Sequence, residues 1–336
     1  MKKMCVFVIL FSLAVFVQAK KLASLVELLN PDAMVIGNNR LYITEGTSIY
    51  IYSLGDFRLV KKFGKEGEGP QEFKIVPFSR LLAFPYNDKI YISSYARLSI
   101  FSRDGDFITE FKTIPFTNNR PFRDIFVGTA SGRGEAGQNV VTIYLFNEKF
   151  VKLKELYVTD FQVGESFSLD LPINSFEFLP YRDRLYVTAG KEGLVIDVFD
   201  EKGSKLSRIK KDYNPLKVTE EFKNKTLEWF KTDLRYKNFW DFMKKRISFK
   251  TYFPAINYMF IEDQRIYILT HKKEGGNTEC LVMDLKGNEL KRVFLPCPDN
   301  YGMDYLPRYG FCNGNFYCLV ENEDGESWEL HMTEIK

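Results

Sequence analysis

The chain has 336 residues, of which 45% are hydrophobic and 16% aromatic, so it can bury a substantial core. This composition excludes an intrinsically disordered protein. The formal net charge of +3 falls to +1 without Lys2 and Lys3, the charged residues of the first 19. Such a balanced charge offers no basic surface for nucleic acid or for an anionic membrane.

The amino terminus has the order of a secretory signal peptide. Two lysines precede an apolar run of 14 residues from Met4 to Val17, and Ala19 ends the segment. As a helix with about 1.5 Å rise per residue, the run would span roughly 21 Å, short of a hydrocarbon core of about 30 Å. We therefore expect residues 1–19 to be a cleaved signal peptide rather than an uncleaved anchor. Residues 20–336 are then an exported domain, periplasmic or extracellular, without a stable membrane span.

A short β-rich segment with a central tyrosine recurs along the rest of the chain. Its five copies are Arg40–Thr44, Lys89–Ser93, Arg184–Thr188, Arg265–Leu269 and Asn315–Leu319. Their β-branched and aromatic content is typical of buried strands. A second strand and a glycine-containing hairpin follow, as in Ile100–Gly105, Val198–Gly203 and Val282–Gly287, and then a third strand. With a weaker leading strand, each unit has the four antiparallel strands of a β-propeller blade.

The spacing of the repeat tyrosines predicts six blades. Tyr42 and Tyr91 are 49 residues apart, which is the length of one blade, whereas Tyr91 and Tyr186 are 95 apart. The longer interval leaves room for a degenerate third blade, with strands near Ile125–Val127 and Val140–Leu145 and an enlarged loop over Gly128–Asn139. A linear solenoid is the alternative architecture, but it would leave open the sheet edges that a closed ring hides.

The last repeat is one strand short. Residues Leu22–Leu29 are expected to supply this strand and close the ring, or else to form a short helix.

A glycine-rich linker joins the first repeat to the second. The string from Phe63 to Phe73 contains Gly64, Gly67, Gly69 and Pro70. Neither a strand–turn–helix unit nor a Lys-Ser/Thr pair accompanies these glycines, which disfavours a phosphate-binding loop. We interpret the string as a blade-to-blade turn, in which the glycines supply backbone freedom and Pro70 stiffens the exit.

Together with the Asp-x-x-Gly hairpins, this linker resembles that of exported bacterial six-bladed propellers related to NHL-repeat and TolB-like proteins. In that family the linker commonly reads Gly-x-x-Gly-x-Gly-Pro-Gly-Glu-Phe, and here Gln71 stands in place of a glycine. The resemblance covers essentially the whole mature chain and implies an all-β, six-bladed propeller. It implies no single activity, because such propellers include scaffolds, ligand binders and some enzymes.

Tyr186 and Tyr267 are 81 residues apart, so an insertion is predicted over residues 212–253, between blades four and five. From Thr219 to Ile247 glycine and proline are absent from the sequence, and helical spacing follows Thr219 as a candidate N-cap. A second short helix is expected near residues 239–243. Aromatic side chains either bury these helices against the propeller or cap one mouth of the channel and contribute to binding. These binding candidates are Trp229, Phe230, Phe239 and Trp240.

The sequence offers little material for catalysis. It contains two histidines, His271 and His331, and no Gly-x-Ser-x-Gly motif, so we assign no catalytic residue. We expect His271, in the hairpin loop of the fifth blade, to be a surface or rim residue and a further binding candidate. Four cysteines follow the expected signal peptide, and disulfides and free buried thiols both remain open for them. These are Cys280, Cys297, Cys312 and Cys318, and their spacing matches no zinc site.

Two functions remain. The first is an exported binding or scaffold protein that recognises a protein, peptide or glycan partner on one propeller face, with no cofactor and no bound metal. The alternative is a lactonase-like or esterase-like hydrolase that holds a divalent metal such as calcium in the channel. Its candidate ligands, Glu45, Asp124, Glu177 and Glu262, lie near predicted strand ends in no common register. We therefore predict the binding role, and the enzymatic alternative rests on analogy of fold alone.

Overall fold

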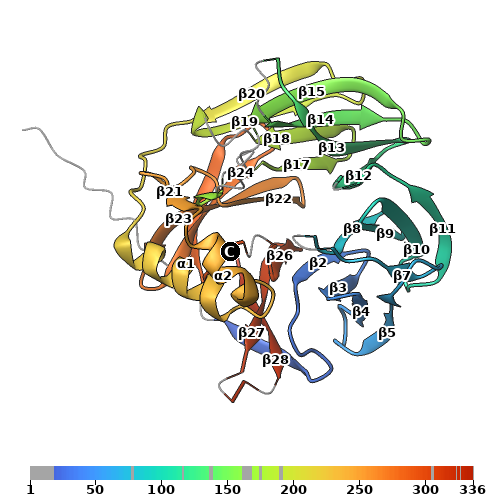
Figure 1. Cartoon of the computed structure of the whole chain (residues 1–336), viewed down its shortest axis with the longest axis horizontal. Helices are drawn as coiled ribbons and strands as arrows, with labels where there is room; N and C mark the ends of the chain where they lie inside the picture. Colours follow the sequence, from blue (N-terminus) through green and yellow to red (C-terminus); the bar gives the residue numbers. More distant parts are fainter. Residues whose placement is uncertain are drawn as a thin grey trace, which may run out of the picture.

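Six four-stranded antiparallel sheets surround a common axis in the computed structural model of the chain (Figure 1). The structure describes residues 19–76, 79–115, 117–135, 139–160, 169–173, 176–188, 192–303, 306–322, 324–325 and 327–335. The expected signal peptide, apart from Ala19, lies outside the described residues. The fold is therefore the predicted all-β, six-bladed propeller.

The first five blades each consist of four consecutive strands, and the first strand of each lies next to the axis (Figure 1). Blade 1 comprises β2 (Ala33–Gly37), β3 (Arg40–Glu45), β4 (Ser48–Ser53) and β5 (Leu59–Phe63). Blade 2 comprises β8 (Leu82–Tyr86), β9 (Lys89–Ser94), β10 (Arg97–Ser102) and β11 (Phe107–Lys112). Blade 3 comprises β12 (Asn119–Phe122), β13 (Ile125–Arg133), β14 (Asn139–Phe146) and β15 (Lys152–Asp160). Blade 4 comprises β17 (Phe178–Tyr181), β18 (Arg184–Thr188), β19 (Leu194–Phe199) and β20 (Lys205–Lys211), and blade 5 comprises β22 (Tyr258–Glu262), β23 (Arg265–Glu274), β24 (Asn277–Asp284) and β25 (Glu289–Leu295).

Blade 6 joins the two ends of the chain. Its inner three strands are β26 (Tyr309–Cys312), β27 (Asn315–Glu321) and β28 (Trp328–Glu334), and its outermost strand is β1 (Lys20–Leu25). β1 pairs antiparallel with β28, with Ala23 opposite Leu330. The expected closing strand is thus confirmed, as a strand and not a helix. It secures the ring because unfolding either terminus removes a strand from the same sheet.

The repeat tyrosines lie on the second strand of their blades and fill the spaces between blades. Tyr42, Tyr91, Tyr186, Tyr267 and Tyr317 are at most 9% exposed. The apolar cluster around Tyr42 reaches from blade 1 to blade 2, and the cluster around Tyr267 reaches from blade 5 to blade 6. Neighbouring blades therefore cohere through the buried faces of their sheets.

The third blade departs from the prediction in its hairpin. The expected loop over Gly128–Asn139 is wrong, since β13 continues to Arg133 and pairs with β14 down to Arg133 opposite Asn139. The glycines suggested a loop, but the β-branched Val140, Val141 and Thr142 extend the ladder on the partner strand. The connection shortens to residues 134–138, of which 136–138 lie outside the described residues.

The insertion between blades 4 and 5 contains the helices. α1 (Glu220–Thr232) begins at the N-cap Thr219, whose hydroxyl accepts a hydrogen bond from the backbone N–H of Phe222. A 3₁₀ turn η2 (Lys237–Phe239) and α2 (Trp240–Met243) follow. β21 (Ile247–Phe249) then pairs in parallel with β16 (Leu169–Leu171), which precedes blade 4. Within the described part of the chain, no helix has the length and hydropathy needed to span a bilayer.

Candidate functional site

A cavity of about 1100 Å³ lies along the propeller axis and receives side chains from all six inner strands. Its wall is mostly apolar. The aromatic residues of the wall are Phe84, Tyr86, Phe176, Phe178, Tyr181, Tyr258, Phe260, Tyr309 and Phe311 on the inner strands and beside them, with Tyr95, Phe222 and Tyr301 from the connections. The cavity is thus a channel site shared by the whole ring rather than a pocket on one blade.

Three of the six inner strands carry a proline on the channel wall. These are Pro85 on β8, Pro121 on β12 and Pro180 on β17. An inner strand pairs on one side only, and its other edge faces the axis. Proline is tolerated on such an edge and removes an N–H donor from it, which makes the channel less polar than a bare strand edge would be.

The inner-strand residues that pair with the repeat tyrosines occupy equivalent positions in the six blades, and we call these positions one level of the channel. In blades 1, 2, 4, 5 and 6 these partners are Val35, Phe84, Leu179, Phe260 and Gly310. In blade 3 the tyrosine is replaced by Val127, and its partner is Arg120. A cation therefore occupies a position that is apolar or glycine in the other five blades.

Arg120 is held by its two neighbouring blades. Its guanidinium lies 4.8 Å from the ring centroids of both Phe84 and Phe178. Nη1 donates a hydrogen bond to the carbonyl oxygen of Phe178 at 3.1 Å, and Nη2 is 3.5 Å from Glu177 Oε2. Burial lowers the pKa of Arg120, and the nearby Glu177 opposes this effect. The side chain nevertheless stays cationic, because the guanidinium pKa starts above about 12.

The carboxylates proposed as metal ligands are not brought together. Glu177 precedes β17 at the end of the channel where the inner strands begin, whereas Glu262 ends β22 at the opposite end. Glu45 accepts a hydrogen bond from the backbone of Leu29, and Asp124 lies in the turn after β12. Among the described residues, no three His, Cys, Asp or Glu side chains are placed to hold a metal ion. These residues do not fit a divalent metal in the channel.

Glu262 should make the stability of the protein depend on pH. Burial raises the pKa of its carboxyl from 4.5 to about 7, and the charge of Asp263 acts in the same direction. Between these values the folded chain keeps a proton that the unfolded chain has lost, so stability falls as the pH rises. We expect Glu262→Gln, which cannot ionise, to raise Tm at pH 8 and to leave it nearly unchanged at pH 4, by differential scanning calorimetry. The exposed Glu274→Gln is the control, and an equal gain in Tm at both pH values would contradict the assignment.

The aromatic residues predicted in the insertion form the core of what we call the helical cap, residues 219–249. Phe230 is fully buried, together with Leu171 and Met243, and Trp229 and Trp240 pack at the margin of this cluster. Phe239 is 49% exposed. The structure thus gives packing positions to three of the four candidates, and their part in ligand binding stays a prediction.

The cap is tied to distant blades by an ion cluster. Asp32, before β2, lies 3.2 Å from Arg80 Nε before β8 and 3.3 Å from Arg235 Nη1 in the turn after α1. Its second oxygen accepts a hydrogen bond from the backbone N–H of Gly46 at 2.8 Å. Burial raises the pKa of Asp32 despite the two arginines. The cap leaves the ring between blades 4 and 5 and is therefore anchored on the side of blades 1 and 2.

His271 lies where the cap meets the channel. The predicted place in the hairpin loop is wrong, because His271 lies within β23, which continues to Glu274. It lines the cavity, and its ring stacks on Phe253 with centroids 4.4 Å apart. Phe222 of α1 packs against the same ring of Phe253 at 4.9 Å. Burial lowers the pKa of His271 to about 3, with Lys273 adding to the effect, so the imidazole is neutral near pH 7. Its role in binding stays a prediction.

The glycine-rich linker is a turn between blades, in agreement with the interpretation above. Gln71 has φ +61°, the left-handed conformation for which the resembled family uses glycine. The Glu72 carboxylate accepts a hydrogen bond from Gly69 N at 2.8 Å, and the N–H of Gly67 donates to the carbonyl of Phe73. Phe73 is fully buried in the core between blades 1 and 2.

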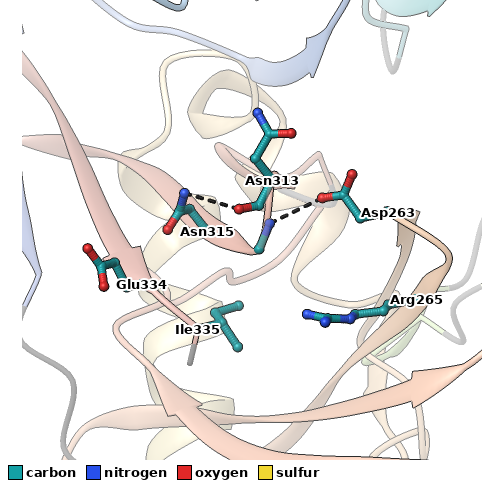
Figure 2. Close-up of a pocket in the computed structure, with 7 residues that line it drawn as sticks. Asp263, Arg265, Asn313, Asn315, Glu334 and Ile335 are labelled. Carbon is teal, nitrogen blue, oxygen red and sulfur yellow. Dashed lines mark hydrogen bonds between the residues drawn. The ribbon is translucent and has the colours of Figure 1, made fainter.

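A second depression, of about 460 Å³, lies where turns of blades 5 and 6 meet (Figure 2). Asp263 Oδ2 accepts a hydrogen bond from Gly314 N at 3.1 Å, and the Asn315 side chain donates to the carbonyl of Asn313 at 3.3 Å. The first bond holds the turn between β26 and β27 against the turn between β22 and β23, and the second lies within the turn between β26 and β27. We interpret the depression as part of the contact between the blades.

The four cysteines are free thiols. Cys280, Cys297 and Cys318 are buried in the apolar core shared by blades 5 and 6, and Cys312 is partly buried. Burial raises the pKa of Cys318 to about 12 and that of Cys312 to about 11. The sequence left both disulfides and free thiols open for these four cysteines, and in the structure they are free thiols.

The sequence analysis missed Arg120, although a signal for it exists. The channel-facing residue lies seven positions before the tyrosine in each recognisable repeat, as Val35 does before Tyr42. Applying that spacing to the degenerate blade requires knowing that Val127 replaces the tyrosine. Only the strand register of blade 3 establishes this replacement.

The fold and the cavity define a six-bladed β-propeller with a largely apolar channel, covered in part by helices. No protein-family profile matches the chain, and no curated protein matches its sequence. Among solved structures, the chain is similar to a luciferin-regenerating enzyme, with 10% identity, 95% of each chain covered and a TM-score of 0.46. It is also similar to Kluyveromyces lactis Hsv2, with 12% identity, 89% of this chain and 96% of that chain covered, and a TM-score of 0.38. At such low sequence identities and TM-scores, these similarities support no conclusion about ligand or activity.

Proposed function

We propose that the chain is an exported binding protein that holds a segment of its partner in the central channel. The observation that carries this proposal is the cavity of about 1100 Å³, walled by aromatic and aliphatic side chains from all six blades. Sites for compact ligands typically enclose about 300–1,000 Å³, with mostly apolar walls and a few polar groups. The channel has the size and lining of such a site.

The lining favours a peptide, free or as part of a protein, over a glycan. Aromatic rings can stack on sugars, but sugar hydroxyls would lose water in the middle of the channel. The rings and prolines there supply few hydrogen-bond partners in return. Apolar peptide side chains make no hydrogen bonds with water, so they lose none in the channel, and burial of their apolar surface is favourable.

Export and the bacterial family belong to the same proposal. The linker string supports a relationship to the exported propellers related to NHL-repeat and TolB-like proteins. The first strand begins at Lys20, directly after the expected cleavage point at Ala19. Amino-terminal sequencing of the protein from periplasm or medium should begin at Lys20, and a protein retained in the cytoplasm with Met1 would contradict export.

The hydrolase alternative is not carried further. It needs oxygen ligands that converge on a metal, and Glu177 and Glu262 lie at opposite ends of the channel.

Occupation of the channel can be tested with the neutral apolar probe N-phenyl-1-naphthylamine. We expect its fluorescence to rise on saturable binding of one molecule per chain, and short apolar peptides to displace it. Gly310 faces the cavity without positive φ, so Gly310→Leu should fill space there. Loss of about two buried CH₂ groups at ~0.8 kcal/mol each weakens binding roughly tenfold.

Gly55→Leu is the matched control, because Gly55 lies in a hairpin of blade 1 with open space around it. Failure of the probe to bind, or equal binding to both leucine variants and the wild type, would refute the channel as the site.

A further inference from the structure

We propose that the channel ligand carries a carboxylate on an apolar body and that Arg120 pairs with this carboxylate. The inference rests on the proposed function, since it concerns the same cavity. Two classes of ligand have a carboxylate on an apolar body. One is an apolar peptide with a free carboxyl terminus, and the other is a small apolar carboxylic acid.

The position of Arg120 in the ring is the first argument. At its level the other blades present Val35, Phe84, Leu179, Phe260 and Gly310, none of which carries a charge. In a ring of six, blade 6 lies across the axis from blade 3, and Figure 1 shows β26 and β12 on opposite sides of the centre. Gly310 lines the same cavity without a side chain, and only Ile36 lies within 4 Å of the place that a side chain there would take. An anionic group at this level of the channel meets a single cation, Arg120.

The contacts of Arg120 are the second argument. Elsewhere in the chain, Arg208 on β20 makes a close bidentate pair with Asp197, with Nε and Nη2 at 2.7 and 2.9 Å from the carboxylate oxygens. Charge-assisted pairs of this kind usually measure about 2.7–2.9 Å. In contrast, the distance from Arg120 Nη2 to Glu177 Oε2 is longer, 3.5 Å, and the Arg120 side chain is 15% exposed. Its charge is thus less fully compensated than that of Arg208, although it is more deeply buried.

The two aromatic rings beside Arg120 suit a flat, delocalised cation. The rings of Phe84 and Phe178 lie at 4.8 Å on the guanidinium, which fixes its plane. A guanidinium held in this way is pre-organised for a planar carboxylate, because little side-chain entropy is lost when the pair forms. The second arginine on the cavity wall, Arg80, already has Asp32 at 3.2 Å.

The remaining walls define the other part of the ligand. Beyond the level of Arg120, the channel is bounded by Ile36, Pro85, Ile261 and Phe311. An aliphatic or aromatic body extending in this direction buries apolar surface. A dianion or a sugar acid would place polar groups against these residues, where they find few partners.

Competition against N-phenyl-1-naphthylamine tests the proposal with two matched ligand pairs. Decanoate is compared with decanamide, and acetyl-Leu-Phe-Leu with a free carboxyl terminus is compared with its amide. We expect the acid of a pair to bind roughly tenfold more tightly than the amide, which is the advantage typical of a hydrogen bond to a charged group. An advantage in the peptide pair alone identifies a carboxyl terminus as the ligand, and an advantage in the decanoate pair alone identifies a small acid. Either result supports the proposal.

Variants assign the effect to Arg120. Arg120→Gln should abolish the preference for the acid while N-phenyl-1-naphthylamine still binds. Glu177→Gln should strengthen acid binding, since it removes the competing carboxylate, and it gives a result even if the first variant fails to fold. Arg123→Gln is the control, because Arg123 pairs with Glu201 at 2.6 Å and is half exposed.

Equal affinity of acid and amide in both pairs would overturn the proposal and leave the channel site intact, provided that the neutral probe binds. So would an acid preference that survives Arg120→Gln, or acid binding that is unchanged by Glu177→Gln. Failure of the neutral probe refutes the proposed function instead.

Discussion

Replacing Phe230 by alanine should lower the free energy of unfolding of the helical cap by about 3–5 kcal/mol, the usual cost of deleting a buried phenylalanine ring. Phe230 is fully buried, with ring centroids 4.9 Å from Trp229 and 5.7 Å from Tyr236. Its cluster joins α1 to β16 and β21, so the cavity left by alanine lies where the cap is assembled. Two of the three tryptophans, Trp229 and Trp240, lie in this region, so urea unfolding followed by tryptophan fluorescence reports on the cap.

Phe239→Ala is the matched control for this prediction. Phe239 belongs to the same segment but is 49% exposed, so its loss should change stability by no more than about 0.5 kcal/mol. Circular dichroism at 215 nm follows the blades and shows whether the cap unfolds before them. Equal effects of the two substitutions would mean that the cap is not packed around Phe230.

Asp32→Asn should destabilise the protein by about 3–5 kcal/mol, because it leaves the buried Arg80 guanidinium without the counter-charge that lies 3.2 Å away. The side chains of Asp32 and Arg80 are each 12% exposed, and Arg235 shares the same carboxylate. Burial raises the pKa of Asp32, so desolvation of this carboxyl outweighs the attraction of the arginines. The carboxylate therefore matters mainly as the counter-charge of the buried Arg80, whereas Arg235 also pairs with Asp233, with Nε at 2.7 Å from Oδ1.

The exposed Asp56→Asn, in a hairpin of the same blade, should leave Tm unchanged. A double variant with Arg235→Gln separates the cluster from a general loss of packing. Because each single variant already loses the 3.3 Å contact between Asp32 and Arg235, the double variant should be less destabilised than the sum of the two single variants, by about 0.5–3 kcal/mol. Strict additivity in thermal unfolding would show that Asp32 and Arg235 do not act together.

These two sites have consequences for binding as well as for stability. The cap contributes Phe222 to the cavity wall and lies beside Tyr301 and Met303 of the connection before blade 6. Damage to its core or to its anchor at Asp32 alters one end of the channel. Binding of N-phenyl-1-naphthylamine by the Phe230 and Asp32 variants therefore shows how much of the site depends on the cap.

The blades are predictable from the amino-acid sequence, because the strands and hairpins of a propeller are local. Tyr42 and its counterparts recur at one-blade intervals, and each hairpin closes within a few residues, so pattern and turn chemistry are readable in a single repeat. The same reasoning failed over Gly128–Asn139, where cross-strand pairing with Val140 and Val141 overrode the loop preference of glycine.

The residues that the blades enclose become known from the three-dimensional arrangement of the ring. Arg120 shares the channel with residues from five other repeats, and its place among them depends on the register of a blade that lacks the repeat tyrosine. Asp32 and Arg235 lie 203 positions apart and meet because the cap reaches across part of the ring. The channel at Arg120 and the anchor of the cap depend on single side chains that differ from repeat to repeat, and which of these side chains meet is set by how the blades and the cap are placed in three dimensions. The channel site that we propose is made of such contacts.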